Sequence, residues 1–289
     1  MTASLNPYIT KFDADFDAEK SMHYRMTIQF SLGGLSFALL DVETQILVAL
    51  ECYQSDDLLA DSNDLFRTLE RALESKGLNN KDFNSVTCLI DNRYNTIVPE
   101  TLFNEADKAK YLEFVHQIPE DYTIASERLD VAHCINVVSW PKALQDKILT
   151  KWKHARITHS SSIFIDSVMH NETKTGVFVH VHNRDFDLVI KKDDKLFFFN
   201  NFKFNTKDDF VYFLLFAMEQ NGFSGQDTPI TFTGLIRPAS EIIELCGRYV
   251  RDLRFAEDTH DLQVSKALDE VPFQFYYIHY QSLKHETVS

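Results

Sequence analysis

Two histidines that are two residues apart, His180 and His182, are the first candidates for chemistry in this sequence. On an extended strand both side chains point to the same face, so the pair could share a metal ion. Only two ligands are evident, however, and histidines on an amphipathic strand are commonly solvated or singly hydrogen-bonded. Both alternatives are open, and we predict no metal site.

Cysteine chemistry is not indicated. Cys134 follows His133, but adjacent residues on a strand face opposite sides and cannot exchange a proton as a catalytic pair. The four cysteines are widely separated and lack the CxxC spacing of zinc and redox sites. We expect buried, reduced thiols at Cys52, Cys88, Cys134 and Cys246.

Asp91 directly follows the short apolar stretch 86–90, which is expected to be a strand. Carboxylates at the carboxyl ends of strands often face the ligand crevice of an α/β sheet, which makes Asp91 a candidate cleft residue. A turn with Asx hydrogen bonding is the simpler alternative, and the sequence alone favours it. Since no motif in the chain is an intact catalytic one, we predict no catalytic residue.

The composition is that of a soluble globular protein and excludes several function classes. Of the 289 residues, 44% are hydrophobic and 25% are charged, and the formal net charge is −14. This charge offers no basic surface to nucleic acids or anionic lipids, so we predict no nucleic-acid partner. The longest apolar run, 210–218, is far shorter than the roughly 20 residues that span a bilayer, and no secretory signal is recognisable. We therefore expect no membrane insertion and a cytoplasmic location.

The apolar pattern alternates between strand and helix periods along the first half of the chain. Residues 1–20 hold four acidic side chains among few apolar ones and are expected to form a loose acidic leader. Residues 24–53 are interrupted at 33–34 and 43–44, which predicts a three-stranded antiparallel meander. The elements expected next are a helix ending at Gly77, a strand at 86–90, an irregular stretch ending near Pro99, a helix at 105–116, a strand at 131–140, a helix at 141–152, a strand at 156–158 and a helix beginning at Ser161.

The second half opens in the same way. The elements expected there are strands at 177–182, 186–191 and 196–200, a helix from Thr206 to Gly222, a strand at 230–233, a helix at 238–250, a strand at 253–256 and a closing aromatic helix at 273–283. The helix after Thr206 is apolar on nearly every side, so we expect it to be buried between a sheet and a neighbouring element.

The two halves repeat one order of elements, namely three strands, a helix and a strand. An offset of 151 residues pairs apolar positions of the meanders: 28 with 179, 30 with 181, 35 with 186, 39 with 190 and 48 with 199. An offset of 145 residues pairs the helices at 65 with 210, 69 with 214, 73 with 218 and 77 with 222. Any two meanders could be superposed in some register, but the recurrence of the whole order favours a duplication. We predict an α/β protein of mixed sheets flanked by helices, with a leader at 1–20, a first lobe at 21–173 and a second lobe at 174–289.

The repeated unit resembles the ribonuclease H-like half of the actin-like ATPase superfamily, which includes actin, sugar kinases, chaperone ATPases and type IV pilus assembly proteins. This resemblance covers nearly the whole chain. The segments 95–103 (NTIVPETLF) and 111–114 (YLEF) more closely resemble a family of uncharacterised proteins from Bacteroidetes-type bacteria with an actin-like fold, a domain of unknown function. The resemblance implies two lobes around a cleft and almost no chemistry.

In working members of the superfamily, the first turn of each meander carries an Asp-x-Gly signature, whose amides hold phosphate oxygens and whose carboxylates position a magnesium ion. Here the first turn, 31–36 (SLGGLS), has Ser31 in place of that Asp. The second turn, 182–187 (HNRDFD), has no glycine and carries a bulky Arg184, while the adenosine-side strand end, 233–236 (TGLI), keeps one glycine. The candidate residues of this degenerate cleft are Ser31, Gly33, Gly34, Ser36, Asp91, His182, Asp185, Thr233 and Gly234.

These observations predict a non-catalytic binding or scaffold protein with a protein as its partner, in the way that pilus-assembly relatives hold peptide segments. No cofactor is predicted. One alternative is an ATP-binding protein or ATPase that keeps Gly33, Gly34 and Gly234, with Asp185 or Asp187 as the ligand of a magnesium ion. Another alternative is self-assembly into filaments, and the sequence leaves the oligomeric state open.

Overall fold

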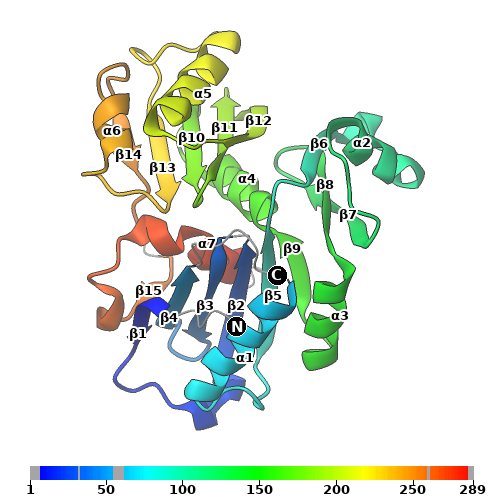
Figure 1. Ribbon diagram of the computed structural model, residues 1–289. Helices are drawn as coiled ribbons and strands as arrows, with labels where there is room; N and C mark the ends of the chain where they lie inside the picture. Colours follow the sequence, from blue (N-terminus) through cyan, green and yellow to red (C-terminus); the bar gives the residue numbers. More distant parts are fainter. Residues whose placement is uncertain (1–6, 32, 55–61, 259–260, 286–289) are drawn as a thin grey trace.

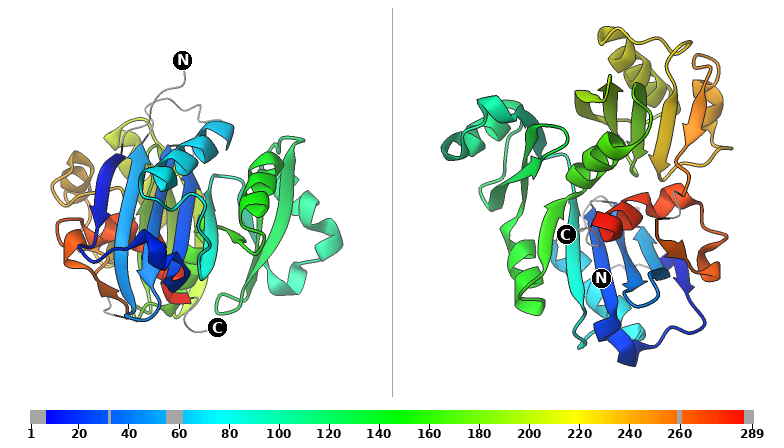
Figure 2. Two further views of the ribbon diagram at one scale, coloured as in Figure 1. Left: turned by 90° about the horizontal axis from the view of Figure 1, so that it is seen from below. Right: turned by 180° about the vertical axis from the view of Figure 1, so that it is seen from behind.

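The computed structural model describes residues 7–31, 33–54, 62–258 and 261–285. Two lobes, each built on one β-sheet, lie on either side of a central cleft, and a small third sheet projects from the side of the first lobe (Figure 1, Figure 2). The fold is thus the two-lobed α/β architecture that the duplicated element order predicts.

The first sheet has seven strands. Their spatial order is β1 (Pro7–Phe12), β4 (Ile46–Gln54), β3 (Gly34–Asp41), β2 (Tyr24–Ser31), β5 (Ser85–Asp91) and β9 (Arg156–His159), with the short β15 (Gln263–Val264) also paired to β4. Helix α1 (Ser62–Ser75) packs its apolar side on one face of this sheet. The predicted meander is confirmed as β2, β3 and β4.

The second sheet has five strands. Their spatial order is β12 (Lys195–Lys203), β11 (Asp185–Lys192), β10 (Gly176–Val181), β13 (Ile230–Gly234) and β14 (Leu253–Phe255). Helices α5 (Lys207–Gln220) and α6 (Glu241–Cys246) pack together on one face of it. Helix α5 begins with the cap expected at Thr206, whose side chain and that of Asp209 form a reciprocal capping box.

The third sheet is an insertion in the first lobe. Its strands, in spatial order, are β6 (Asn95–Pro99), β8 (Cys134–Pro141) and β7 (Tyr122–Leu129). Helix α2 (Lys108–Val115) covers it, and α3 (Lys142–Lys151) leads back to contact α1. The short 3₁₀ helices of the chain are η1 (Ala18–His23), η2 (Glu100–Leu102), η3 (Glu105–Asp107), η4 (Lys266–Leu268) and η5 (Phe273–Tyr276).

The strand registers confirm the internal duplication. Ile28 lies opposite Phe37 in the first sheet and Val179 lies opposite Leu188 in the second, which is the pairing that an offset of 151 residues predicts. Helices α1 and α5 both begin and end 145 residues apart, at 62 and 207 and at 75 and 220. The order β4-β3-β2-β5-β9 also matches β12-β11-β10-β13-β14. Each lobe therefore contains one copy of the same five-stranded unit.

One pairing of the predicted repeat is wrong. The offset of 151 places Val48 on Phe199, but Ala38 lies opposite Leu50 while its equivalent, Val189, lies opposite Phe199. The equivalent of Phe199 is therefore Leu50, at an offset of 149. The reason is the turn before the third strand, which covers residues 42–45 in the first lobe and only 193–194 in the second.

Five other parts of the chain differ from the expectations. The leader is not loose throughout, because residues 7–12 form β1 and pair with β4. The stretch before Pro99 is not irregular but forms β6, and residues 122–129, to which no element was assigned, form β7. The helix expected at 238–250 is regular only over α6. Helix α5 is not buried on every side, since Tyr212 and Phe216 are exposed.

Helices α4 (Ser160–His170) and α7 (Tyr277–His285) pack side by side between the two sheets (Figure 1). Helix α4 follows the first sheet but packs on β11 of the second, and α7 follows the second sheet but packs on β2 and β3 of the first. Lys191 of the second lobe holds the end of α4, since its Nζ donates to the carbonyls of Met169 and Asn171 at 3.1 and 2.7 Å. The closing aromatic helix is confirmed, whereas the boundaries of the lobes at 173 and 174 stay a prediction.

The four cysteines are buried and free, as expected. Within the part of the chain that the structure describes, no helix is long and apolar enough to cross a membrane.

Candidate functional site

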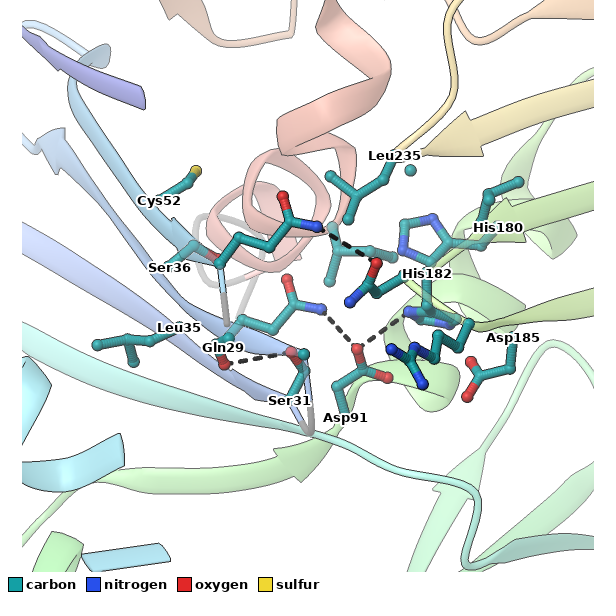
Figure 3. A pocket seen from close by; sticks show the side chains of 18 of the residues that line it. Gln29, Ser31, Leu35, Ser36, Cys52, Asp91, His180, His182, Asp185 and Leu235 are labelled. Carbon is teal, nitrogen blue, oxygen red and sulfur yellow. Dashed lines mark hydrogen bonds and ion pairs between the residues drawn. The ribbon is translucent and has the colours of Figure 1, made fainter. Parts of the chain in front are cut away.

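A cavity of about 240 Å³ lies in the cleft between the lobes, where the turns of the two meanders meet α7 (Figure 3). Most of the residues that the sequence analysis proposed line this cavity: Ser31, Gly33, Gly34, Ser36, Asp91, His182, Asp185 and Gly234. Thr233 does not line it but is buried behind His180. The topology therefore brings residues from both halves of the chain to one place.

His182 lies in the cleft between two carboxylates, one from each lobe. Its Nδ1 lies 3.0 Å from Oδ2 of Asp91 in the first lobe, and its Nε2 lies 3.3 Å from Oδ2 of Asp187 on β11. Burial by itself lowers the pKa of the His182 imidazole, but the carboxylates of Asp91 and Asp187 outweigh this effect and raise the pKa well above 6.5. His182 is therefore an imidazolium at neutral pH, held between two carboxylates.

Asp91 accepts hydrogen bonds on both oxygens. Gln29 donates from Nε2 to Oδ2 at 3.2 Å (Figure 3), and Ser160 donates from Oγ to Oδ1 at 3.1 Å. Burial would raise the pKa of this carboxyl, but the His182 imidazolium holds it well below its usual range. Ser160 is the first residue of α4, and the helix dipole also favours a negative charge at this point.

The turn after β5 does contain an Asx hydrogen bond, but Asn92 makes it. The Asn92 Oδ1 accepts from the backbone N–H of Tyr94 at 2.7 Å. Asp91 is thus free of its own turn and faces the cleft, where its partners come from β2, α4 and the second lobe.

Two neutral histidines surround the ion pair. His180 Nδ1 lies 2.7 Å from Thr233 Oγ1, and its ring meets that of His182 edge to face at 4.7 Å between centroids. Burial lowers the pKa of His180 to about 3 and that of His159 to about 4. His180 and His182 share one face, as expected, but they bind different partners and do not converge on one ligand position.

The two turns that would enclose a phosphate contact each other. A Cβ on Gly33 would lie 3.0 Å from the Cβ of Asn183, and Gln54 Nε2 donates to Asn183 Oδ1 at 3.2 Å. Ser31, which replaces the metal-positioning Asp, donates from Oγ to the Gly34 carbonyl of its own turn at 3.2 Å. The two turns are therefore in direct contact at one side of the cavity that they line. Leu32 falls outside the described residues.

Two of the candidate glycines are required by backbone packing. A Cβ on Gly234 would lie 2.2 Å from the Val181 carbonyl oxygen, and a Cβ on Gly34 would lie 2.0 Å from that of Tyr53. Gly234 also has a φ of +84°, which favours glycine. Both positions need glycine whether or not a nucleotide binds.

Several residues of the cleft were missed by the sequence analysis. His279 of α7 places Nδ1 2.7 Å from Thr27 Oγ1 and Nε2 2.7 Å from Ser36 Oγ, and burial lowers its pKa to about 3. Gln29 and Ser160 hold Asp91. The polar residues Thr27 and Gln29 inside an otherwise apolar strand could have indicated that this strand has polar partners. The sequence does not identify those partners, which lie up to 252 residues away.

The chemistry of this arrangement is that of a structural ion-pair cluster. His182 holds its proton between two carboxylates, so it is not a base near neutral pH. Its single positive charge is shared by Asp91 and Asp187, which leaves one net negative charge on the three groups. Burial raises the pKa of Cys52, which lines the cavity, to about 12, so its thiol is protonated. Ser31 stands where the resemblance implies a metal-positioning aspartate, and among the described residues no three His, Cys, Asp or Glu side chains are grouped as metal ligands.

Known structures share this fold. A protein of unknown function with an actin-like ATPase fold from Bacteroides thetaiotaomicron VPI-5482 superposes with a TM-score of 0.73 at 17% identity, covering 83% of this chain and 93% of that one. The PilM–PilN type IV pilus biogenesis complex gives a TM-score of 0.62 at 11% identity, covering 92% and 98%. No curated protein matches the sequence significantly.

A family model for proteins of unknown function, DUF3822, matches residues 13–253, and this range contains the duplicated unit and nearly all of the cleft. The chain therefore belongs to the DUF3822 family of proteins of unknown function and has an actin-like ATPase fold.

Proposed function

We propose that this protein is a non-catalytic binding or scaffold protein, in which the nucleotide cleft of the fold has become a fixed contact between the lobes. The observation that carries the proposal is the ion pair between His182 and Asp91, which joins the lobes where working members of the superfamily hold phosphate. A triphosphate would have to displace Asp91 and Asp187 from a buried imidazolium, which leaves charges without partners.

The size of the cavity supports this proposal. Its volume of about 240 Å³ is below the roughly 300–1,000 Å³ of usual ligand pockets, which favours a small occupant or none. Separation of the lobes would enlarge it but would break the Asp91–His182 pair and the contact of Gly33 with Asn183 together.

A protein partner is the proposed use of the two-lobed body. One structure of similar fold is a complex of two pilus biogenesis proteins, which supports binding of a protein rather than chemistry on a small molecule. We place the protein in the cytoplasm and retain the division into lobes at 21–173 and 174–289 as part of this proposal.

The test is the melting temperature of the purified protein with and without millimolar magnesium-ATP. A ligand at about 100 times its dissociation constant adds roughly 2.7 kcal/mol, which is a shift of several degrees at about 2–4 °C per kcal/mol. We expect no shift, and no ATP consumed above a protein-free blank in a single-turnover assay. A shift that Gly33→Val abolishes and the control Gly222→Ala retains would overturn the proposal.

A further inference from the structure

The second lobe exposes aromatic side chains along one edge of its sheet. Phe197 on β12 is 48% exposed, and Tyr212 and Phe216 on α5 are 60% and 45% exposed. Tyr212 stacks on Phe216 at 5.8 Å, and Phe213 stacks on Phe202 of β12 at 5.7 Å between centroids. We call the surface formed by Phe202, Tyr212, Phe213 and Phe216, whose rings contact one another in series, the aromatic edge. Exposed aromatic groups of this kind are typical of interaction sites.

The first lobe shows how the equivalent sheet edge is covered by an added strand. In the first lobe the outer edge of β4 is covered by β1, which pairs antiparallel with residues 49–53. The equivalent residues of β12 are 198–202, from the offset of 149 established by Leu50 and Phe199. Within the described part of the chain, β12 is the outermost strand of its sheet and no strand pairs with its outer edge.

The helix beside this edge differs between the lobes at two solvent-exposed positions. The offset of 145 places Tyr212 on Arg67 and Phe216 on Arg71, and both arginines are exposed on α1. The first lobe, whose edge is covered within the chain, thus presents cations there, whereas the second lobe presents aromatic rings. The aromatic groups are not a requirement of the fold, because the same helix in the other copy does without them.

The charges at the ends of β12 select the partner. Lys195 and Lys203 are exposed, and Lys203 lies where β12 borders the central cavity. Neither lysine forms an ion pair with a carboxylate in the residues that the structure describes. Full antiparallel pairing of β12 with a second copy would set Lys195 opposite Lys203 at both ends, which is unfavourable. An acidic strand would instead place carboxylates beside both lysines.

We propose that an extended acidic segment of a partner protein adds to β12 as an antiparallel strand opposite Phe198–Phe202, with its apolar side chains on Tyr212 and Phe216. Main-chain hydrogen bonds to the free edge give affinity, and the aromatic groups and the two lysines give specificity. The inference deepens the proposed binding function and rests on it.

The test is selection from a displayed library of random 12-residue peptides on the purified protein. We expect enriched peptides that alternate apolar and acidic residues, and at least a tenfold weaker binding of those peptides, as synthetic copies, to the double variant Tyr212→Arg/Phe216→Arg, which carries the residue type of the first lobe. The control is Tyr249→Arg, which changes an aromatic side chain that is 52% exposed outside the aromatic edge. Backbone N-methylation of a bound peptide should abolish binding, and hydrogen exchange should slow in β12.

The outcomes separate this inference from the proposed function. Peptides that bind the double variant as well as the wild type, or that are basic, overturn the aromatic edge as the docking site while leaving a binding protein in place. Absence of any enriched peptide overturns the docking site as well. ATP hydrolysis would contradict the proposed function without touching the peptide result. Equal melting temperatures of the double variant and the wild type show that a loss of binding is not a loss of folding.

Discussion

Asp91 at the end of β5 and His182 at the end of β10 form an ion pair of 3.0 Å that joins the two lobes. The residues are 91 positions apart in the chain and belong to different copies of the repeated unit. Because β5 and β10 end at the same cleft, the duplication places the carboxylate of one copy against the imidazole of the other. The pair links the two copies directly across the cleft, and its removal gives the first prediction.

His182→Asn should lower the free energy of unfolding by about 3–5 kcal/mol, because it leaves the buried carboxylates of Asp91 and Asp187 without a cation. The measurement is urea unfolding at pH 7. The control His154→Asn changes an exposed histidine and should cost less than about 0.5 kcal/mol.

A double-mutant cycle then isolates the pair. Asp91→Asn and His182→Asn together should cost less than the sum of the two single variants, since the second change removes a charge that the first has left unpaired. Strictly additive losses would contradict the ion pair between Asp91 and His182.

Gly234→Ala should destabilise the protein by more than about 2 kcal/mol. The new Cβ would lie 2.2 Å from the Val181 carbonyl oxygen, so β10 and β13 must separate to admit it. Gly222→Ala is the matched control: its φ of +78° is similar, but nothing lies within 4 Å, so only the backbone term of about 1–2 kcal/mol remains. Equal losses in thermal unfolding of the two variants would show that packing at Gly234 is not the cause.

The protein should lose stability as the pH falls below about 6.5. Burial depresses the pKa of His159, His180 and His279 to about 4, 3 and 3, so these rings stay neutral in the folded chain while they bind protons in the unfolded one. Their contribution is complete above pH 6.5 and is lost as the pH falls toward 4. His182 has the opposite effect on the pH dependence of stability. Its pKa is raised in the folded chain, so its contribution is complete below pH 6.5 and is lost at higher pH.

His279→Gln tests this assignment. Removing one titrating ring should lower the slope of unfolding free energy against pH near pH 5 by about 1.4 kcal/mol per pH unit, the value for one proton. His180→Gln should reduce the slope in the same way. Urea titrations at pH 7, 6 and 5 measure it, and a slope identical to that of the wild type would mean that neither ring is held neutral.

Thr206→Ala should lower the free energy of unfolding by about 1 kcal/mol, because the capping box loses the side-chain oxygen that accepts from the Asp209 amide at 3.1 Å. Thr206→Ser keeps that oxygen and is the matched control. Thermal unfolding of both variants measures the difference, and a loss of similar size in Thr206→Ser would place the effect outside the cap.

Elements with strong periodicity could be predicted from the sequence, and those held by other elements could not. In the meanders and α5, apolar residues recur at clear strand or helix spacing. Their positions, and the duplication, can therefore be predicted from the residue pattern. Strand β1 has only partly buried side chains, and it is a strand because β4 offers it an edge. Strand β7 is likewise only partly buried along most of its length, and its period is weak for the same reason.

The candidate site likewise contains residues that could be located from the sequence and partners that could not. The two turns and Asp91 could be located because they follow apolar strands, and the structure places them around one cavity. Their partners could not be assigned: Ser160 reaches Asp91 over 69 residues and His279 reaches Thr27 over 252. Only the crossing of α4 and α7 between the sheets brings these side chains into the cleft.

The crossing of α4 and α7 between the lobes also affects how the chain folds during its synthesis. The face of β2 and β3 that carries Thr27 and Ser36 is closed by His279, which follows these residues by 252 and 243 positions. The strands of the first sheet therefore leave the exit tunnel long before α7, and this face has no cover from α7 while the second lobe is being synthesised. A chain that is cut before α7 would expose Thr27 and Ser36 without their histidine partner.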